Sequence, residues 1–136
     1  MAHYTLVKTP PSIEAYRRLR KLSGLSPKSL AAAEAGLPNT WYGVHMTSCD
    51  EVVGMGRIVG DGGCHFQIVD IAVLPEHQRR GLGKEIMTAL MTYLDAHAPE
   101  SAYVSLIADG PAKDLYAMFG FQATAPVSIG MWRPQR

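Results

Sequence analysis

The sequence predicts an α/β protein of the α+β type, with a central mixed, mostly antiparallel sheet of about six or seven strands and about four helices. Residues Phe66–Leu74 form a nearly continuous apolar run, which is typical of a central strand covered on both faces. Apolar side chains recur at helical spacing from Leu82 to His97, and Ala102–Ala108 is again strand-like. This order of strand, helix and strand predicts a parallel crossover at the centre of the fold, with antiparallel hairpins beside it.

Length and composition restrict the class of protein. The 136 residues are enough for one domain, which we expect to span residues 1–136 and to bury a sizeable core. With 47% apolar and 18% charged residues the chain should fold, and a net charge of +1 disfavours a nucleic-acid-binding surface. The apolar runs are shorter than a membrane span and the first residues lack a signal-peptide pattern, so we expect a cytoplasmic protein with no membrane partner.

The amino-terminal half is expected to contain three strands and two helices. Ser12 precedes apolar residues at helical spacing and suits an N-cap, and Pro27 suits the first position of a second, shorter helix. Residues rich in strand formers then flank a turn at Ser48–Glu51, which predicts an antiparallel hairpin. In chain order the elements are the strand Tyr4–Val7, the helices Ile13–Leu22 and Lys28–Ala35, and the strands Thr40–Thr47 and Val52–Val59.

The carboxyl-terminal part adds one helix and two strands after the crossover. Pro99 ends the long helix, and Gly120 suits the end of a short helix over Ala112–Phe119. The segments Phe121–Ala123 and Ile129–Arg133 are predicted as the last two strands. The predicted order of elements is therefore β-α-α-β-β-β-α-β-α-β-β.

The stretch Gln78–Lys84, between the central strand and the long helix, combines two glycines with three cations. Gly81 and Gly83 let a ligand approach the backbone closely. The first turn of a helix leaves N–H groups without partners, and together with the helix dipole these groups favour an anion. The arginine and lysine side chains add positive charge at the same point. The stretch therefore predicts a cradle for a phosphate or pyrophosphate group.

Three phosphate-binding patterns compete for this stretch. A Walker P-loop needs Ser or Thr after its lysine, whereas Lys84 is followed by Glu85. A dinucleotide fingerprint needs a third glycine where the chain has Ile86, so this match is weak. The segment Gln78–Gly83 fits every fixed position of the Gln/Arg-x-x-Gly-x-Gly/Ala signature of the GNAT acetyltransferases, which bind the pyrophosphate of acetyl-CoA.

Two further segments strengthen the resemblance to the GNAT acetyltransferases. Leu115–Phe121 follows the family's Leu-Tyr-x-x-x-Gly-Phe pattern at the expected distance after the cradle, and Asp70–Glu76 resembles the family's strand leading into it. The matches together cover roughly Val52–Phe121. The predicted order of elements is also that of the GNAT fold. The chain is therefore similar to the small, single-domain bacterial members of this family.

The resemblance implies transfer of an acetyl group from the co-substrate acetyl-CoA to a primary amine of a small molecule, by direct attack in a ternary complex. A protein or peptide N-acetyltransferase, and a non-catalytic acyl-CoA sensor on the same fold, are the alternatives. The implied cofactor-binding residues lie at the end of the central strand, in the cradle, and at one later position where many relatives carry Asn. They are Ile71, Ala72, Val73, Gln78, Arg79, Arg80, Gly81, Leu82, Gly83, Lys84 and, at that last position, Asp109.

Two proton transfers in this reaction need catalytic groups. Tyr116 is the candidate acid for the leaving thiolate, because a phenol with a pKa of about 10 is protonated at neutral pH. Several relatives place a base at the position of Gln67, which cannot act as one. Asp70 ranks first as the base, with His65, Glu76 and a water chain as alternatives. Strand alternation puts Asp70 on the face opposite Gln67, and an Asp70 that is buried and bonded to a neighbouring arginine fits the sequence equally well.

The acceptor side is expected to be aromatic and only weakly acidic, which favours an amine with an apolar or aromatic body. Residues 26–36 should line it, together with one strand and the end of the chain. The individual residues expected there are Trp41, Tyr42, His45 and Trp132. The two cysteines and five histidines form no metal-ligand spacing, so we expect no metal site. Because small members of the family are often dimers, a homodimer is a further expectation from the resemblance.

Overall fold

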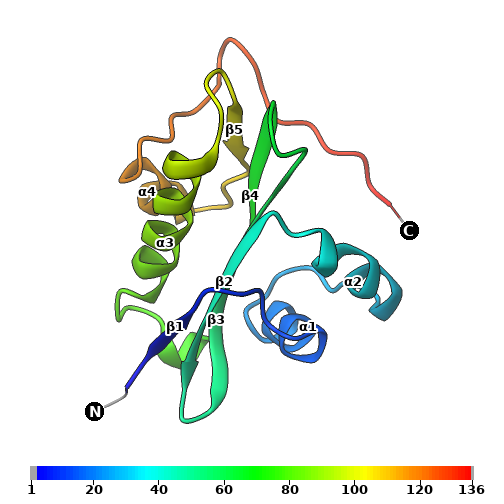
Figure 1. Cartoon of the computed structure of the whole chain (residues 1–136), viewed down its shortest axis with the longest axis vertical. Helices are drawn as coiled ribbons and strands as arrows, with labels where there is room; N and C mark the ends of the chain where they lie inside the picture. The colour runs from blue at the N-terminus through cyan, green and yellow to red at the C-terminus, as the bar shows by residue number, and fades with distance from the viewer. Residues whose placement is uncertain (1–2, 136) are drawn as a thin grey trace.

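The structure, a computed structural model, describes residues 3–135 (Figure 1). Within these residues the five strands form one sheet of spatial order β1-β2-β3-β4-β5. The expected domain of residues 1–136 also includes residues 1, 2 and 136, which lie outside the described residues. The strands and α-helices, in chain order, are β1 (Thr5–Val7), α1 (Ile13–Leu22), α2 (Leu30–Gly36), β2 (Tyr42–Ser48), β3 (Glu51–Gly60), β4 (His65–Val73), α3 (Leu82–His97), β5 (Tyr103–Leu106) and α4 (Ala112–Ala117).

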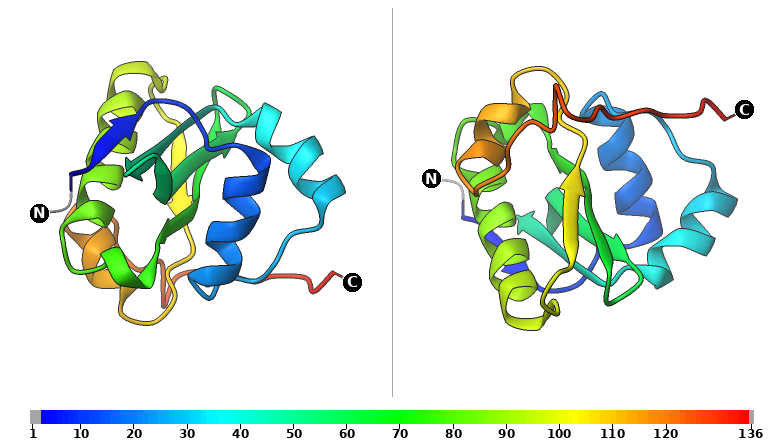
Figure 2. Two further views of the ribbon diagram at one scale, coloured as in Figure 1. Left: turned by 90° about the horizontal axis from the view of Figure 1, so that it is seen from below. Right: turned by 90° about the horizontal axis from the view of Figure 1, so that it is seen from above.

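Helices cover both faces of the sheet. Helices α3 and α4 pack on one face and α1 and α2 on the other, as Figures 1 and 2 show. Leu19 of α1 and Ile86 and Leu90 of α3 are fully buried between the layers. Gly56 of β3 permits the close approach of α3, because a Cβ atom at this position would lie 2.6 Å from Cγ2 of Ile86. Among the described residues, no helix is both long enough and apolar enough to span a membrane.

The central crossover and the hairpins agree with the sequence-based prediction. Strands β1 to β4 pair antiparallel, and β4 pairs parallel with β5 after the crossover through α3. The predicted N-cap of α1 is also confirmed, because the Ser12 hydroxyl accepts the N–H of Ala15 at 3.2 Å. Helix α2 begins later than predicted, because its N-cap is Ser29, which accepts the N–H of Ala32 at 3.1 Å.

The carboxyl-terminal tail, residues 121–135, departs from the prediction. No strand follows α4 within the described residues, so the strands predicted at Phe121–Ala123 and Ile129–Arg133 are wrong and the sheet is smaller than expected. The tail instead makes a turn, in which Ser128 donates its backbone N–H to the Thr124 carbonyl at 3.0 Å, and then continues without regular structure. Strand-forming residues alone do not make a strand, since the backbone groups must pair with a neighbour.

Strand β4 carries a bulge that opens the sheet on one side. The register between β3 and β4 shifts after Met55, and Asp70 and Ile71 are left outside the ladder. Asp70 has a φ of 59°, in the left-handed region that few non-glycine residues adopt. The pairing of β4 with β5 ends where Ile68 faces Leu106. Beyond this pair the two strands separate, and the last half of β4 loses its neighbour on that side.

Candidate active site

A cavity of about 530 Å³ occupies the opening between β4 and β5. Its walls come from β4, from α1 and the loop after it, from the end of β5 and from α4. The lining residues are Arg20, Gly24, Leu25, Ser26, Gln67, Ile68, Val69, Asp70, Ile71, Ile107, Asp109, Ala112 and Tyr116. The volume lies in the range of roughly 300–1,000 Å³ that is typical of small-molecule sites.

The backbone of β4 beyond the bulge presents N–H groups to this opening. The N–H of Leu74 bonds to the Val53 carbonyl of β3 at 2.9 Å. Because N–H groups alternate sides along a strand, those of Val73 and Ile71 turn away from β3, toward the side that β5 has left. Ala72, which sequence analysis grouped with these two, faces Met55 of β3 instead. An extended ligand with amide groups can therefore pair with the exposed edge as an added strand would.

The amino terminus of α3 follows directly after this edge. Gly81 is its N-cap, with a φ of 80° that glycine adopts without strain. No side chain caps this end of the helix, so its first N–H groups are available to a ligand. An added Cβ atom would meet nothing within 4 Å at Gly81, and only Leu115 at 3.4 Å at Gly83. The cradle is thus open, and the dipole of a 16-residue helix favours an anion there.

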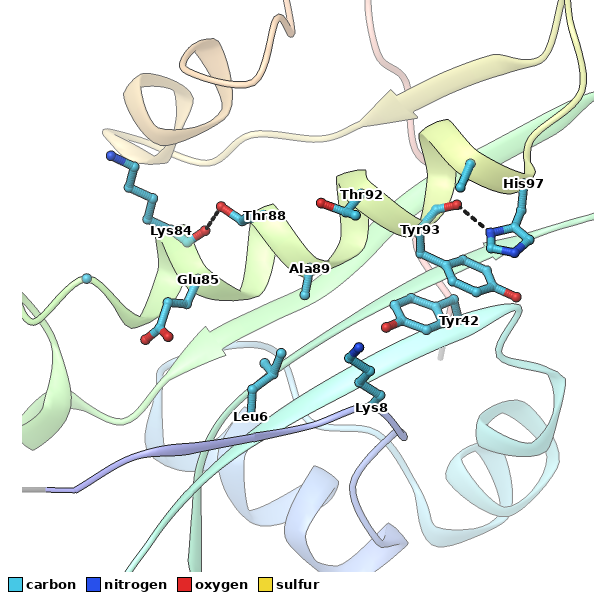
Figure 3. A pocket seen from close by; sticks show the side chains of 12 residues that line it. Leu6, Lys8, Tyr42, Lys84, Glu85, Thr88, Ala89, Thr92, Tyr93 and His97 are labelled. Atoms are coloured by element: carbon cyan, nitrogen blue, oxygen red, sulfur yellow. Dashed lines mark hydrogen bonds between the residues drawn. The ribbon is translucent and has the colours of Figure 1, made fainter.

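The side chains of the cradle have different positions. Gln78 donates its side-chain amide N–H to the Val73 carbonyl at 3.0 Å, so it fastens the loop to the end of β4. Arg80 donates to the hydroxyl of Tyr4 at 3.0 Å, a partner that sequence analysis did not identify because it lies 76 positions away in the chain. Lys84 extends from the first turn of α3 toward α4 (Figure 3). Arg80 and Lys84 therefore extend in different directions from the amino terminus of α3.

Tyr116 and Asp109 meet in the wall of the cavity. Tyr116 is 9% exposed, and burial, followed by the charge of Asp109, raises the pKa of its phenol above the ordinary 10.0. The phenol is therefore protonated at neutral pH and can donate a proton or a hydrogen bond. Asp109 is exposed to the cavity, and no side chain among residues 3–135 makes a hydrogen bond or ion pair with its carboxylate.

Asp70 is the anion of a buried cluster that joins α1, β3 and β4. Its carboxylate accepts hydrogen bonds from Nη1 of Arg20 and from Nε of Arg57, the latter at 2.8 Å. The hydroxyl of Tyr16 donates to the same carboxylate at 3.0 Å, and burial, followed by the charge of Asp70, raises the pKa of that phenol. The two arginines are only 7% and 8% exposed, so the cluster is shielded from water.

This cluster agrees with the alternative prediction of Asp70 as a buried acid bonded to an arginine, and it argues against Asp70 as the general base. Three donors already occupy its oxygens, and a proton on Asp70 would leave two buried guanidinium groups without a counter-ion. His65 and Glu76 are exposed elsewhere and do not line the cavity, whereas Gln67 lines it without a basic group. The carboxylate that does lie open in the cavity is Asp109, which sequence analysis assigned only to cofactor binding.

The aromatic residues predicted for the acceptor pocket lie elsewhere. Trp41 packs against Phe66, with ring centroids 4.5 Å apart. Tyr42 stacks on Tyr93 at 3.8 Å in a separate groove between α3 and the β1–β2 edge (Figure 3). Nδ1 of His45 forms a hydrogen bond with the backbone carbonyl oxygen of Thr9, at 2.7 Å. None of these three predicted residues lines the cavity between β4 and β5, because Tyr42 and His45 lie on β2 and Trp41 directly before it, two strands away from β4.

Of the other acceptor predictions, only the loop after α1 reaches the cavity. Of the expected region 26–36 only Ser26 lines it, and Gly24 and Leu25, just before that region, line it as well. Trp132 does not line it and is 83% exposed in the tail. This wall of the cavity is therefore formed by α1 and its loop, with the end of β5 opposite.

Comparison with known proteins identifies the family. A family model described as "Acetyltransferase (GNAT) domain" matches residues 23–131, which is well over half of the chain. The chain belongs to the GNAT acetyltransferase family. Acetyl-CoA is the acyl donor of these enzymes, and the segment Gln78–Gly83 lies within the matched residues.

Individual relatives agree with this assignment. A probable acetyltransferase from meticillin-resistant Staphylococcus aureus is 47% identical, with a TM-score of 0.93 over 98% of this chain and 100% of that one. GCN5-related N-acetyltransferase 2, chloroplastic, of Arabidopsis thaliana is 34% identical over 86 residues, which are 62% of this chain and 33% of that protein. The chain thus spans about a third of the length of that curated relative. An aminoglycoside N-acetyltransferase solved in complex with CoA shares the fold, at 17% identity and a TM-score of 0.68 over 100% of this chain and 97% of that one.

The residues of this GNAT-family chain fit acetyl-CoA. The uncapped end of α3, with open space at Gly81 and Gly83, suits a pyrophosphate. The N–H groups of Ile71 and Val73 suit the amides of a pantetheine arm, which would bring its thioester into the cavity beside Tyr116. When bound, acetyl-CoA supplies the activated acyl group, while the chain's own residues hold and orient it.

The cradle gives a direct test of this fit. A Gly83→Glu substitution places a negative charge at the amino terminus of α3, and we expect the affinity for acetyl-CoA to fall at least about tenfold. Titration calorimetry measures the change. The control is Thr92→Glu, an exposed position further along the same helix, which should bind acetyl-CoA as the unaltered protein does. Equal affinity in the Gly83→Glu protein would show that the pyrophosphate binds elsewhere.

The Asp70 cluster predicts a stability effect. Asp70→Asn removes the only carboxylate between two buried guanidinium groups, so we expect the free energy of unfolding to drop by about 3–5 kcal/mol in urea titrations. Glu51→Gln removes the partner of Arg18 in a pair whose Glu side chain is 57% exposed, and should cost about 1 kcal/mol or less. An Asp70→Asn protein that kept its stability but lost turnover would instead support Asp70 as the base.

Proposed function

We propose that this acetyltransferase transfers an acetyl group from acetyl-CoA to a primary amine of a small molecule, by direct attack in a ternary complex. The observation that carries the proposal is the cavity between β4 and β5. It joins an exposed strand edge, a protonated phenol and an open carboxylate. Its volume of about 530 Å³, closed on the acceptor side by α1 and the loop after it, suits a small amine.

The acyl donor is held along β4 in this proposal. The N–H groups at the start of α3 bind the pyrophosphate, and the N–H of Val73 pairs with the pantetheine arm. Ile71 lines the cavity whereas Val73 does not, so the N–H of Ile71 is the better placed donor to the thioester carbonyl. A well-aimed donor to the oxyanion of the tetrahedral intermediate contributes about 3 kcal/mol to transition-state stabilisation.

Tyr116 acts as the acid in this mechanism. The amine nitrogen attacks the thioester carbon, a C–N bond forms, and the C–S bond breaks as the intermediate collapses. The leaving thiolate takes the proton of the Tyr116 hydroxyl, and the phenolate is neutralised again by solvent or by the proton released from the amine. Because burial and Asp109 raise the pKa of Tyr116 above 10.0, the hydroxyl remains protonated throughout the neutral and mildly alkaline range.

Asp109 is the proposed proton acceptor for the amine. A lysine-like amine is only about 0.04% neutral at pH 7, so the attacking nitrogen needs to lose a proton first. Asp109 is the carboxylate of the cavity wall that is not paired with a side chain of the described chain, and it also attracts an ammonium group electrostatically. Many relatives carry Asn at this position, so the proposal assigns this chain a base that those relatives lack there.

Tyr116→Phe tests the acid. We expect the rate of CoA release with an accepted amine to fall about 10²–10⁴-fold, since a positioned acid contributes that much. Acetyl-CoA affinity, measured by calorimetry, should stay the same because the ring is retained. The matched control is Tyr93→Phe in the separate groove behind α3, which should keep full activity. Full activity in Tyr116→Phe would exclude the acid role, and a wild-type protein that binds acetyl-CoA but acetylates no amine would point to a non-catalytic sensor.

Asp109→Asn tests the base by restoring the amide that many relatives carry. We expect turnover at pH 7 to fall about 10²-fold or more, with acetyl-CoA affinity unchanged. The loss should shrink as the pH rises toward the pKa of the amine, because an increasing fraction of the substrate is already neutral. A panel that includes small amines and lysine peptides identifies the acceptor at the same time. Undiminished turnover in Asp109→Asn at pH 7 would leave water as the proton acceptor.

A further inference from the structure

Arg80, the residue directly before the N-cap Gly81 of α3, is held by a neutral partner. Its Nη1 donates a hydrogen bond to the hydroxyl oxygen of Tyr4 at 3.0 Å. Among residues 3–135 no carboxylate forms an ion pair with this guanidinium group. A carboxylate would fix the side chain and cancel its charge, whereas a phenol fixes it and leaves the charge in place. Arg80 is therefore oriented and still fully cationic beside the uncapped end of α3.

The hydroxyl of Tyr4 is itself fixed by His77. The Tyr4 oxygen lies 2.8 Å from Nδ1 of His77, and the two rings meet edge to face with their centroids 5.6 Å apart. Because the guanidinium group donates to this oxygen, the hydroxyl proton is left to bond with Nδ1, which places the ring proton of His77 on Nε2. The three side chains thus form one directed chain of hydrogen bonds, from Arg80 through Tyr4 to His77. In such a chain each bond polarises and strengthens the next.

The backbone on either side of Arg80 adopts left-handed conformations. The φ of Arg79 is 63° and that of Gly81 is 80°. Glycine adopts such a φ without strain, but few other residues do, and they keep it only where the surrounding structure fixes them. Gln78 fastens this loop to the end of β4, and the bond from Arg80 to Tyr4 fastens it to β1. Tyr4 therefore belongs to the support of the cradle.

Tyr4 is a rigid support, whereas Arg80 is a long, exposed side chain. Tyr4 directly precedes β1, whose Thr5 pairs with Thr47 of β2, and its half-buried ring packs against the hydrophobic core. An exposed arginine without an anchor would lose its rotamer freedom at the moment a ligand binds. The bond to Tyr4 removes part of this freedom beforehand, so that ligand binding has a smaller entropic cost.

We propose that Tyr4, backed by His77, is a positioning residue of the donor site, which holds the guanidinium group of Arg80 ready for the pyrophosphate of acetyl-CoA. The inference rests on the proposed function in one respect, namely that acetyl-CoA is the ligand of the cradle. Tyr4 uses one N–H of the guanidinium group, and the four that remain suffice for a two-point contact with a phosphate. Neither Tyr4 nor His77 lines the cavity between β4 and β5, so both act on donor binding rather than on the chemical step.

Tyr4→Phe removes the hydroxyl and keeps the ring. We expect the Kd of acetyl-CoA, measured by titration calorimetry, to rise about three- to tenfold, the effect of one hydrogen bond, while kcat for an accepted amine stays the same. In an Arg80→Gln background the same substitution should change the Kd little, because the group that Tyr4 positions is gone. In the matched Arg79→Gln background the full loss should remain.

This comparison separates positioning from a general loosening of β1, which would lower the affinity equally in every background. Equal affinities of the wild type and Tyr4→Phe, or the same loss in the Arg80→Gln background as in the Arg79→Gln background, would overturn the proposal. A wild type that binds no acetyl-CoA would overturn the proposed function as well, whereas equal affinities overturn this inference alone.

Two further titrations locate the contact and test the chain of hydrogen bonds. Dephospho-CoA keeps the pyrophosphate and lacks the 3′-phosphate, so the loss caused by Tyr4→Phe should persist with this ligand. If the loss disappeared, Arg80 would contact the 3′-phosphate and the proposal would be wrong. His77→Asn places an amide oxygen close to the position of Nδ1, so it should retain more affinity for acetyl-CoA than His77→Leu, which offers no acceptor to Tyr4. The reverse order would exclude His77 as the support of Tyr4.

Discussion

The opening in the sheet depends on one buried anion. Asp70 has a left-handed backbone conformation that costs about 1–2 kcal/mol for a non-glycine residue, and it forms the bulge in β4. Its carboxylate is held by two guanidinium groups and a phenol from α1 and β3, so the side-chain cluster stabilises the strained backbone. Without this cluster β4 could slip into a regular ladder, which would turn every later side chain to the opposite face. The position of the exposed N–H groups therefore follows from Asp70, whose carboxylate is already occupied by three donors.

The same cluster sets the electrostatics of the cavity. Asp70 lines it, but its charge is balanced by Arg20 and Arg57, so it offers little attraction to an incoming ammonium group. Asp109 is not paired in this way, and its charge acts on Tyr116 and on whatever enters the cavity. The two carboxylates thus have separate tasks, one structural and one exposed to the ligand. This division follows from burial and pairing, since the residue type is the same.

Local sequence signals predicted the parts of the site that are local in the structure. The change from a strand pattern to helical spacing around Gly81 and Gly83 located the cradle, because both the turn and the uncapped helix end arise within a few residues. A bond between Asp70 and a neighbouring arginine was one of the two predictions for this residue, but its partners on α1 could not be predicted, since Tyr16 and Arg20 approach it from 54 and 50 positions away in the chain. The aromatic residues of β2 were misassigned for a related reason. A strand shows which residues alternate, but not which neighbouring strand or helix each face meets.

The two edges of the sheet differ in how well they are protected from further strand pairing. Strand β1 is three residues long and is followed by Lys8 and a pair of prolines, features that protect an edge from further pairing. Strand β5 has no charged residue and no proline within Tyr103–Leu106, and an apolar groove lies beside it. A net charge of +1 gives little repulsion between copies. An unprotected edge with an apolar groove would favour disordered association unless a specific segment covered it. Segment 129–133 has the strand-forming composition that the sequence analysis recognised, but no neighbouring strand among the described residues pairs with it, so it forms no strand.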